Sequence, residues 1–120
     1  MLSFTAATTT GAGRGKGLGT PTINLNLEQI PAALGEGIYA CIANDQPAVM
    51  HYGPRPVFRD STTCEVHFLD AEPAKGLASL TVTVVEKIRD VRDFPSPDAL
   101  KEQIEEDILC TREILENGKW

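Results

Sequence analysis

The acidic stretch Glu65-Val66-His67-Phe68-Leu69-Asp70 contains the first candidate for chemistry. Side chains alternate along a strand, so Glu65 and His67 share one face while Val66 and Phe68 share the other, which suits a core. A carboxylate near a substrate hydroxyl can accept its proton as a general base. Histidine titrates in a suitable range, but Glu65 is the stronger candidate. The alternative is a solvated strand face without a chemical role.

Thr22 and Asn24, in the segment TPTIN, are candidate metal ligands. They lie two positions apart, which places a hydroxyl and an amide oxygen on the same face of a strand. Mg²⁺ prefers hard oxygen ligands and usually takes further ligands from a nucleotide and water. A polar, solvated strand face is the alternative interpretation.

Glycine fills five of the nine positions from Gly11 to Gly19, and Arg14 and Lys16 lie among them. The backbone N–H groups of such a loop can approach phosphate oxygens, and the two cations add charge. The segment matches neither G-x-x-x-x-G-K-[ST] nor G-x-G-x-x-G, so it is neither a P-loop nor a dinucleotide-binding turn. A flexible surface loop is the alternative.

Phe94 lies in an ion-rich loop, Arg89–Ser96, directly before a predicted helix. It could stack on a flat ligand or pack against the start of the helix as a hydrophobic staple. The sequence alone favours the staple.

The elements that must position these residues are short strands followed by one helix. Alternating, β-branched segments separated by Gly, Pro and Asp predict a small antiparallel barrel or sandwich, with a turn at Asn44-Asp45. In the second segment, Ile23, Leu25 and Leu27 are expected to share a face. The predicted strands cover 2–10, 22–27, 37–44, 47–51, 64–69 and 80–88.

The C-terminal segment changes to helical spacing. Ser96 can cap a helix, Pro97 suits its first position and Gly118 is a plausible end. We expect this amphipathic helix to pack on the barrel through one apolar stripe. The stripe contains Leu100, Ile104, Ile108 and Leu115.

Composition sets the limits on function. The chain has 120 residues, which favours a single domain over 1–120. Its 11 Lys and Arg against 17 Asp and Glu give a net charge of -6, which argues against nucleic acid as a partner. No stretch approaches the roughly 20 apolar residues of a membrane span. Three widely spaced cysteines suit a reducing compartment, so we expect a cytoplasmic monomer that acts on small molecules.

The order of these segments resembles the riboflavin kinase (flavokinase) family. The resemblance runs from about Ser3 to Leu115 through GRGKGLGTPTIN, GIYA, YGPRPVF, EVHFLD and IRDVRDFPS. Its most specific parts are the G-R-G-x-x-L-G-x-P-T-x-N segment and the E-V-H-x-L-D strand. In bacteria this domain is commonly the C-terminal half of a bifunctional riboflavin kinase/FAD synthetase.

The resemblance implies a mainly β fold, a six-stranded antiparallel Greek-key barrel with a C-terminal α-helix. It implies ATP-dependent phosphorylation of the riboflavin 5′-hydroxyl, giving FMN and ADP. Thr22 and Asn24 would hold Mg²⁺, and Glu65 would be the catalytic base. Arg89, Phe94 and Arg112 would border the flavin. The nucleotide would be bound by Gly13, Arg14, Gly15, Lys16, Gly17, Gly19 and Thr22.

The sequence departs from the family pattern at three places. Thr20 replaces a usual Phe, Val57 replaces a hydroxyl residue, and the Tyr-Gly that often follows the acidic strand is missing. These departures keep two alternatives open. One is a non-catalytic flavin or nucleotide binder, and the other is a phosphotransferase for a different alcohol, since fold alone does not fix the acceptor.

Overall fold

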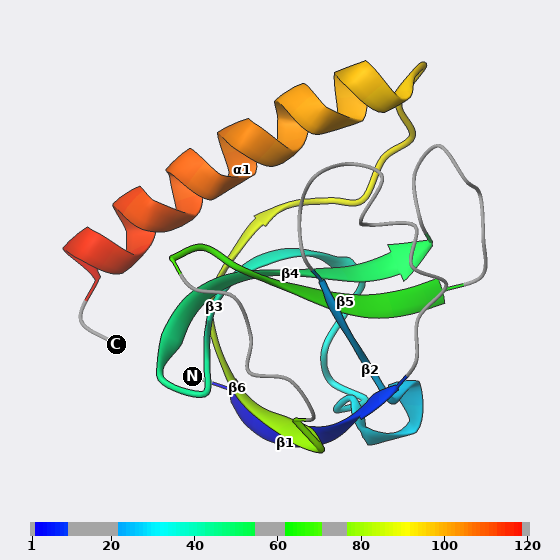
Figure 1. Cartoon of the computed structure of the whole chain (residues 1–120), viewed down its shortest axis with the longest axis vertical. Helices are drawn as coiled ribbons and strands as arrows, with labels where there is room; N and C mark the ends of the chain where they lie inside the picture. Colours follow the sequence, from blue (N-terminus) through cyan, green and yellow to red (C-terminus); the bar gives the residue numbers. More distant parts are fainter. Residues whose placement is uncertain (1, 10–21, 55–61, 71–76, 119–120) are drawn as a thin grey trace.

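The computed structural model describes residues 2–9, 22–54, 62–70 and 77–118, which form six strands, one 3₁₀ turn and one long α-helix (Figure 1). Their β-branched, alternating sequences account for the strands, because such side chains suit a pleated, half-buried surface. In chain order the elements are β1 (Leu2–Thr9), β2 (Ile23–Leu25), η2 (Leu27–Gln29), β3 (Gly37–Ala43), β4 (Gln46–Pro54), β5 (Thr62–Phe68), β6 (Ser79–Arg89) and α1 (Pro97–Asn117).

The strands close into a barrel in the order β1-β2-β5-β4-β3-β6, and each neighbouring pair is antiparallel. Strands β3, β4 and β5 are consecutive neighbours, and β6 returns to lie beside β3, which is the Greek-key arrangement. Strands β1 and β6 complete the closure, with Leu2 in register with Val84. The predicted six-stranded antiparallel barrel with a C-terminal helix is confirmed.

The predicted turn at Asn44-Asp45 joins β3 to β4. Both residues have positive φ, 46° and 66°, as a two-residue hairpin loop requires and as Asn and Asp tolerate. Asn44 also binds the neighbouring strand: its side-chain oxygen accepts from the Thr81 N–H at 2.9 Å, and its own N–H donates to the Thr81 carbonyl at 2.9 Å. The turn therefore also ties the hairpin to β6.

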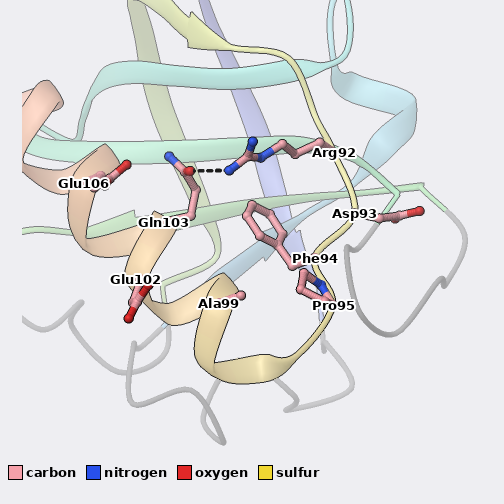
Figure 2. A pocket seen from close by; sticks show the side chains of 8 residues that line it. All are labelled: Arg92, Asp93, Phe94, Pro95, Ala99, Glu102, Gln103 and Glu106. Carbon is pink, nitrogen blue, oxygen red and sulfur yellow. Dashed lines mark hydrogen bonds between the residues drawn. The ribbon is translucent and has the colours of Figure 1, made fainter.

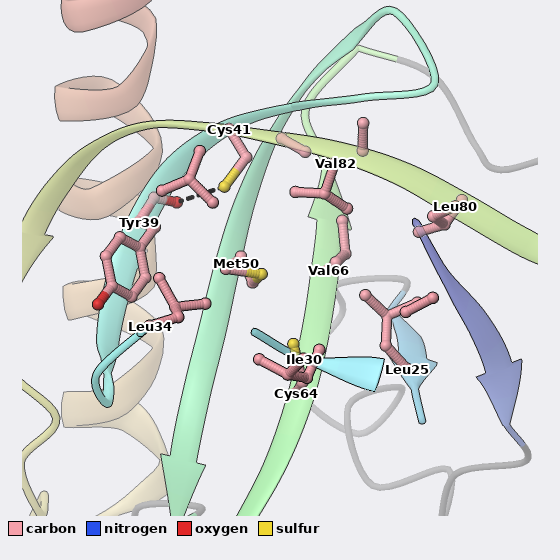
Figure 3. Close-up of a cluster of buried hydrophobic side chains, with 14 residues drawn as sticks. Leu25, Ile30, Leu34, Tyr39, Cys41, Met50, Cys64, Val66, Leu80 and Val82 are labelled. Atoms are coloured by element: carbon pink, nitrogen blue, oxygen red, sulfur yellow. Dashed lines mark hydrogen bonds between the residues drawn. The ribbon is translucent and has the colours of Figure 1, made fainter. Parts of the chain in front are cut away.

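The barrel interior is filled by apolar side chains from all six strands (Figure 3). Met50, Val66 and Leu80 are among its fully buried members. Cys41 and Cys64 are free thiols in the same core, and burial raises the pKa of Cys64 to about 12. Both therefore behave as small hydrophobes.

The expectation for Leu27 is wrong. Strand β2 ends at Leu25, and Leu27 instead begins η2, where it is 41% exposed. The change of direction is made at Asn26, whose side chain accepts a hydrogen bond from the Glu28 N–H at 3.0 Å. Such a local side-chain bond competes with the strand ladder.

Helix α1 begins and ends where the sequence predicts. The Ser96 hydroxyl accepts from the Ala99 N–H at 3.2 Å, Pro97 is the first helical residue, and the Gly118 N–H donates to the Ile114 carbonyl at 2.8 Å. The helix lies along the outside of the barrel against β3, β4 and β6 (Figure 1). It buries residues that point away from the barrel interior, such as Ile38 and Val49.

The buried face of α1 differs from the predicted apolar stripe. Its buried residues are Leu100, Asp107 and Thr111, whereas Ile104 and Ile108 are only half-buried. The Thr111 hydroxyl donates to the Asp107 carbonyl at 2.8 Å. Polar residues can occupy this line because their hydrogen-bonding groups find partners within the interface.

Two arginine–carboxylate pairs fasten α1 to the barrel. In the buried clamp, Arg89 of β6 donates from Nε and Nη2 to the carboxylate of Asp107, with Nη2 to Oδ2 at 2.8 Å. Their side chains are 18% and 5% exposed. In the exposed clamp, Arg112 of α1 donates to Asp70 at 2.6 Å, and these side chains are 39% and 52% exposed. Arg112 also donates to the Leu69 carbonyl at 3.1 Å.

Candidate functional site

A row of aligned residues runs across five strands on the outer side of the barrel. Asn24 of β2 is opposite Glu65 of β5, and Glu65 is opposite His51 of β4. His51 is opposite Ile38 of β3, which is opposite Arg89 of β6. Directly opposed residues project to the same side of a sheet. The row therefore joins the candidate base, a candidate metal ligand and the start of the ion-rich loop that contains Phe94.

Glu65 is the central member of this row. Its neighbour Val66 is fully buried in the barrel core, so Glu65 projects to the outer side, as the alternation predicts. The side chain is nevertheless only 9% exposed. The interpretation as a solvated strand residue is therefore wrong. Ionisable groups at such depth are uncommon outside sites where their charge is used or compensated.

Asn24 lies beside Glu65 with a neutral amide oxygen, and Thr22, with a hydroxyl oxygen, precedes Asn24 by two positions in the chain. Asn24 is in register with Glu65, and both Thr22 and Asn24 are half-buried. Within the described ranges, no three His, Cys, Asp or Glu side chains are grouped so that they could hold a metal. A cation here would depend on neutral oxygens and on ligands from a bound molecule, and this donor set fits Mg²⁺ better than a transition metal.

His67 is two residues from Glu65 on the same strand. Burial, reinforced by nearby His51 and opposed by Asp107, lowers the pKa of His67 to about 4. Its Nδ1 atom is buried and has no hydrogen-bond partner among the described residues. His67 is therefore neutral at pH 7, and its electrostatic interaction with Asp107 links it to α1.

Phe94 lines a surface pocket of about 360 Å³ between the loop after β6 and the first half of α1 (Figure 2). The Arg92 guanidinium carbon lies 4.8 Å from the centre of the Phe94 ring, and that of Arg89 lies 5.6 Å away. The ring thus has cationic groups beside it, a favourable arrangement for an aromatic face. The pocket is lined by Arg92, Asp93, Phe94, Pro95, Ala99, Glu102, Gln103 and Glu106.

Sequence reasoning missed three members of this region, namely Arg92, Gln103 and Asp107. Arg92 Nη2 donates to Gln103 Oε1 at 2.7 Å (Figure 2), and Gln103 Nε2 donates to Asp107 Oδ1 at 3.0 Å. The signal in the sequence was the spacing of Gln103 and Asp107, four apart on one helix face. Their partners come from β6 and the following loop, which helical spacing does not indicate.

Arg112 lies on the same helix but does not line the Phe94 pocket. It follows the pocket residue Glu106 by six positions and Asp107, the partner of Arg89, by five, or about 7–9 Å at the rise of an α-helix. Its guanidinium is bonded to Asp70 and Leu69. The predicted flavin-binding residues are thus brought together in part, Arg89 with Phe94.

The predicted nucleotide loop lies outside the described residues, as do the departures at Thr20 and Val57 and the stretch around Gly76. Of the residues proposed to bind nucleotide, the structure describes Thr22. The others are Gly13, Arg14, Gly15, Lys16, Gly17 and Gly19.

Comparison with known proteins adds two findings. The family described as riboflavin kinase (flavokinase) matches residues 1–115. A crystal structure described as a macrolide-efflux protein from Streptococcus pneumoniae is similar, with a TM-score of 0.73 and 25% identity over 98% of this chain. This chain spans 39% of the length of that protein. No curated protein matched the sequence. In the described part of the chain, no helix is long and apolar enough to cross a membrane.

Proposed function

This chain belongs to the riboflavin kinase family, and we propose that it transfers the terminal phosphoryl group of ATP to the 5′-hydroxyl of riboflavin, giving FMN and ADP. The observation that carries the proposal is the register of β2 and β5. It sets the buried Glu65 directly opposite Asn24, which supports our assignment of Glu65 as the base and Asn24 as an oxygen ligand of one site.

Glu65 acts as the general base in this proposal. The riboflavin hydroxyl oxygen forms a bond to the terminal phosphorus as the bond from that phosphorus to the ADP oxygen breaks. The hydroxyl proton passes to the Glu65 carboxylate. Phosphoryl transfer depends mostly on positioning and charge stabilisation, and a positioned general base contributes about 10²–10⁴-fold to the rate.

Thr22 and Asn24 would hold Mg²⁺, through their side-chain oxygens. When bound, Mg²⁺ neutralises phosphate charge. The backbone of the glycine-rich segment, with Arg14 and Lys16, would enclose the nucleotide phosphates and exclude water.

The ring of the acceptor would occupy the Phe94 pocket. Three exposed carboxylates, Asp93, Glu102 and Glu106, line this pocket. They disfavour a ligand that brings phosphate there and suit a neutral, flat ring stacked on Phe94. Arg89 is separated from Glu65 by three strand spacings in the row, about 14 Å along the sheet. The ribityl chain would span from the pocket toward Glu65.

For location and assembly, we propose a cytoplasmic enzyme that acts as a monomer on small molecules and binds no nucleic acid. The free cysteines Cys41, Cys64 and Cys110 and the net charge of -6 support it. We place Arg112 outside the acceptor site, because it does not line the Phe94 pocket and its guanidinium is bonded to Asp70 and Leu69.

The test is to incubate the protein with riboflavin, ATP and Mg²⁺ and to quantify FMN by chromatography. We expect Glu65→Gln to lower the rate by about 10²–10⁴-fold. The matched control is Glu86→Gln, at an exposed position of β6, and we expect it to retain the wild-type rate.

Each other outcome rejects one part of the proposal. Equal rates in wild type and Glu65→Gln would reject the base assignment and keep the kinase. Absence of FMN from folded wild-type protein would reject riboflavin as acceptor. Titration with riboflavin and a panel of alcohols would then separate a binding protein from a phosphotransferase for another alcohol.

A further inference from the structure

The side-chain amide of Gln103 lies between two opposite charges, Asp107 and Arg92. Its NH₂ group donates to Asp107 Oδ1 at 3.0 Å, and its oxygen accepts from Arg92 Nη2 at 2.7 Å. Both ends of the amide are therefore used, and the amide has one favourable orientation.

Asp107 dictates that orientation. Its carboxylate can only accept hydrogen bonds, and two bonds from Arg89 on the barrel hold it in place. Because the side chain is 5% exposed, water cannot readily replace its partners. Gln103 must turn its NH₂ group toward Asp107, which leaves its oxygen directed at Arg92.

Arg92 is the exposed end of this chain of contacts. An arginine on a loop has many rotamers, and fixing it costs conformational entropy. The bond to Gln103 restricts it to the position where its guanidinium lies 4.8 Å from the Phe94 ring centre. Arg92, Phe94 and Gln103 all line the same pocket (Figure 2).

We propose that Gln103 is a positioning residue for the acceptor. Because its NH₂ group is bonded to the buried carboxylate of Asp107, its oxygen accepts from Arg92 and holds Arg92 against Phe94. This contact shapes the wall on which a flat aromatic ring stacks. This inference rests on the proposed function, because it assigns the pocket to the ring of the phosphoryl acceptor. It predicts that binding of riboflavin depends on the hydrogen-bond polarity at position 103, whereas binding of ATP does not.

The first experiment compares kinetic constants for the two substrates. We expect Gln103→Ala to raise the KM for riboflavin, and its Kd measured by flavin fluorescence, roughly tenfold, the loss of one charge-assisted hydrogen bond. The KM for ATP should change less than about twofold. Glu105→Gln, on an exposed face of the same helix and outside the pocket, is the control and should leave all constants unchanged.

The second experiment reverses the polarity of the network. Gln103→Glu removes the donor to Asp107 and places two carboxylates together, so it should weaken riboflavin binding at least as much as Gln103→Ala. Adding Asp107→Asn restores a donor between the two positions, keeps an oxygen for Arg89 and returns the net charge to that of the wild type. We expect the double variant to recover riboflavin binding to within about threefold of the wild type.

The outcomes separate this inference from the function on which it rests. Parallel changes in the constants for ATP and riboflavin, or a double variant no better than Gln103→Glu alone, would overturn the positioning role while the wild type still makes FMN. Wild-type protein that neither binds riboflavin nor makes FMN would overturn the proposed function first, and the inference with it. Thermal unfolding of every variant confirms that each is folded in the assay.

Discussion

The two clamps of helix α1 use the same chemistry in opposite surroundings. Arg89 extends from the barrel to a carboxylate on the helix, whereas Arg112 extends from the helix to a carboxylate on the barrel. The exposed pair has the shorter single contact, 2.6 Å against 2.8 Å. The buried pair has two nitrogen donors and a further donor from Gln103.

Distance is therefore a poor guide to what these pairs contribute. An exposed pair is screened by water and must also order two long side chains. A buried pair costs free energy to desolvate, but removing one partner leaves the other charge uncompensated. The buried clamp holds the middle of α1, next to the pocket residues Gln103 and Glu106, and its disruption should lower stability strongly. The exposed clamp lies five residues further along the helix, and its disruption should lower stability only slightly.

The largest expected effect comes from Asp107→Ala. This change leaves the Arg89 guanidinium, 18% exposed, beside an empty site. We expect the free energy of unfolding to fall by about 3–5 kcal/mol, measured by chemical denaturation. Asp107→Asn, which keeps the shape and one acceptor, should cost less. A loss below about 1 kcal/mol for Asp107→Ala would abolish the distinction between the clamps.

The next effect is a dependence of stability on pH, which comes from His67 of β5. His67 has a pKa of about 4 when folded, against an ordinary value of 6.5, so the unfolded chain binds its proton more readily. The contribution of His67 to the free energy of unfolding is fully present above pH 6.5. About 3 kcal/mol of it is lost as the pH decreases toward 4.

Denaturation at several pH values measures this dependence in the wild type and in His67→Gln. The variant should lack the part of the slope between pH 6.5 and 4 that His67 supplies. The same slope in both proteins would show that His67 is not buried in its neutral form. Added salt should change this pH slope less than it changes the contribution of the exposed clamp to stability, because buried groups are screened less.

A smaller effect is expected at the start of the helix. Ser96→Ala removes the acceptor for the Ala99 N–H and should lower the free energy of unfolding by about 1 kcal/mol. Ser79→Ala, at the exposed start of β6, is the matched control. If the two substitutions cost the same, the buried clamp and not the cap sets where α1 begins.

The smallest effect is expected from Arg112→Ala. Loss of the exposed clamp should lower the free energy of unfolding by about 0.2–1 kcal/mol, and this small difference should shrink in high salt. Riboflavin binding should stay as in the wild type, since Arg112 does not line the Phe94 pocket and its guanidinium is bonded to Asp70 and Leu69. A large change in riboflavin affinity would return Arg112 to the acceptor site.

The strands and the helix could be predicted well from the sequence because their signals are local. These signals left a barrel or a sandwich open, and the closed six-stranded barrel was predicted from the family resemblance. Alternation predicted that Val66 and Glu65 lie on opposite faces of β5, and the caps Ser96 and Gly118 indicated the helix ends. Leu27 was misassigned because the bond from Glu28 to the Asn26 side chain ends the strand earlier than alternation suggests.

The site was less accessible to prediction because its contacts are not local. An aspartate within a helix is expected to be solvated, whereas Asp107 is buried with donors from Arg89 of β6 and from Gln103. The stripe of Leu100, Ile104, Ile108 and Leu115 has the right spacing, yet α1 is turned so that Asp107 and Thr111 face the barrel. The opposition of Asn24 and Glu65 likewise depends on strand register, which separate segments do not specify.

The closure of the barrel has a consequence for how the chain is made. Strand β1 pairs with β6 along its length, from Leu2 with Val84 to Ala7 with Ser79, while its described pairing with β2 is confined to Thr8 and Thr9. Contacts so distant in sequence form slowly, because the intervening chain must lose entropy first. On a ribosome, β1 waits until about three-quarters of these 120 residues are synthesised before its main partner exists.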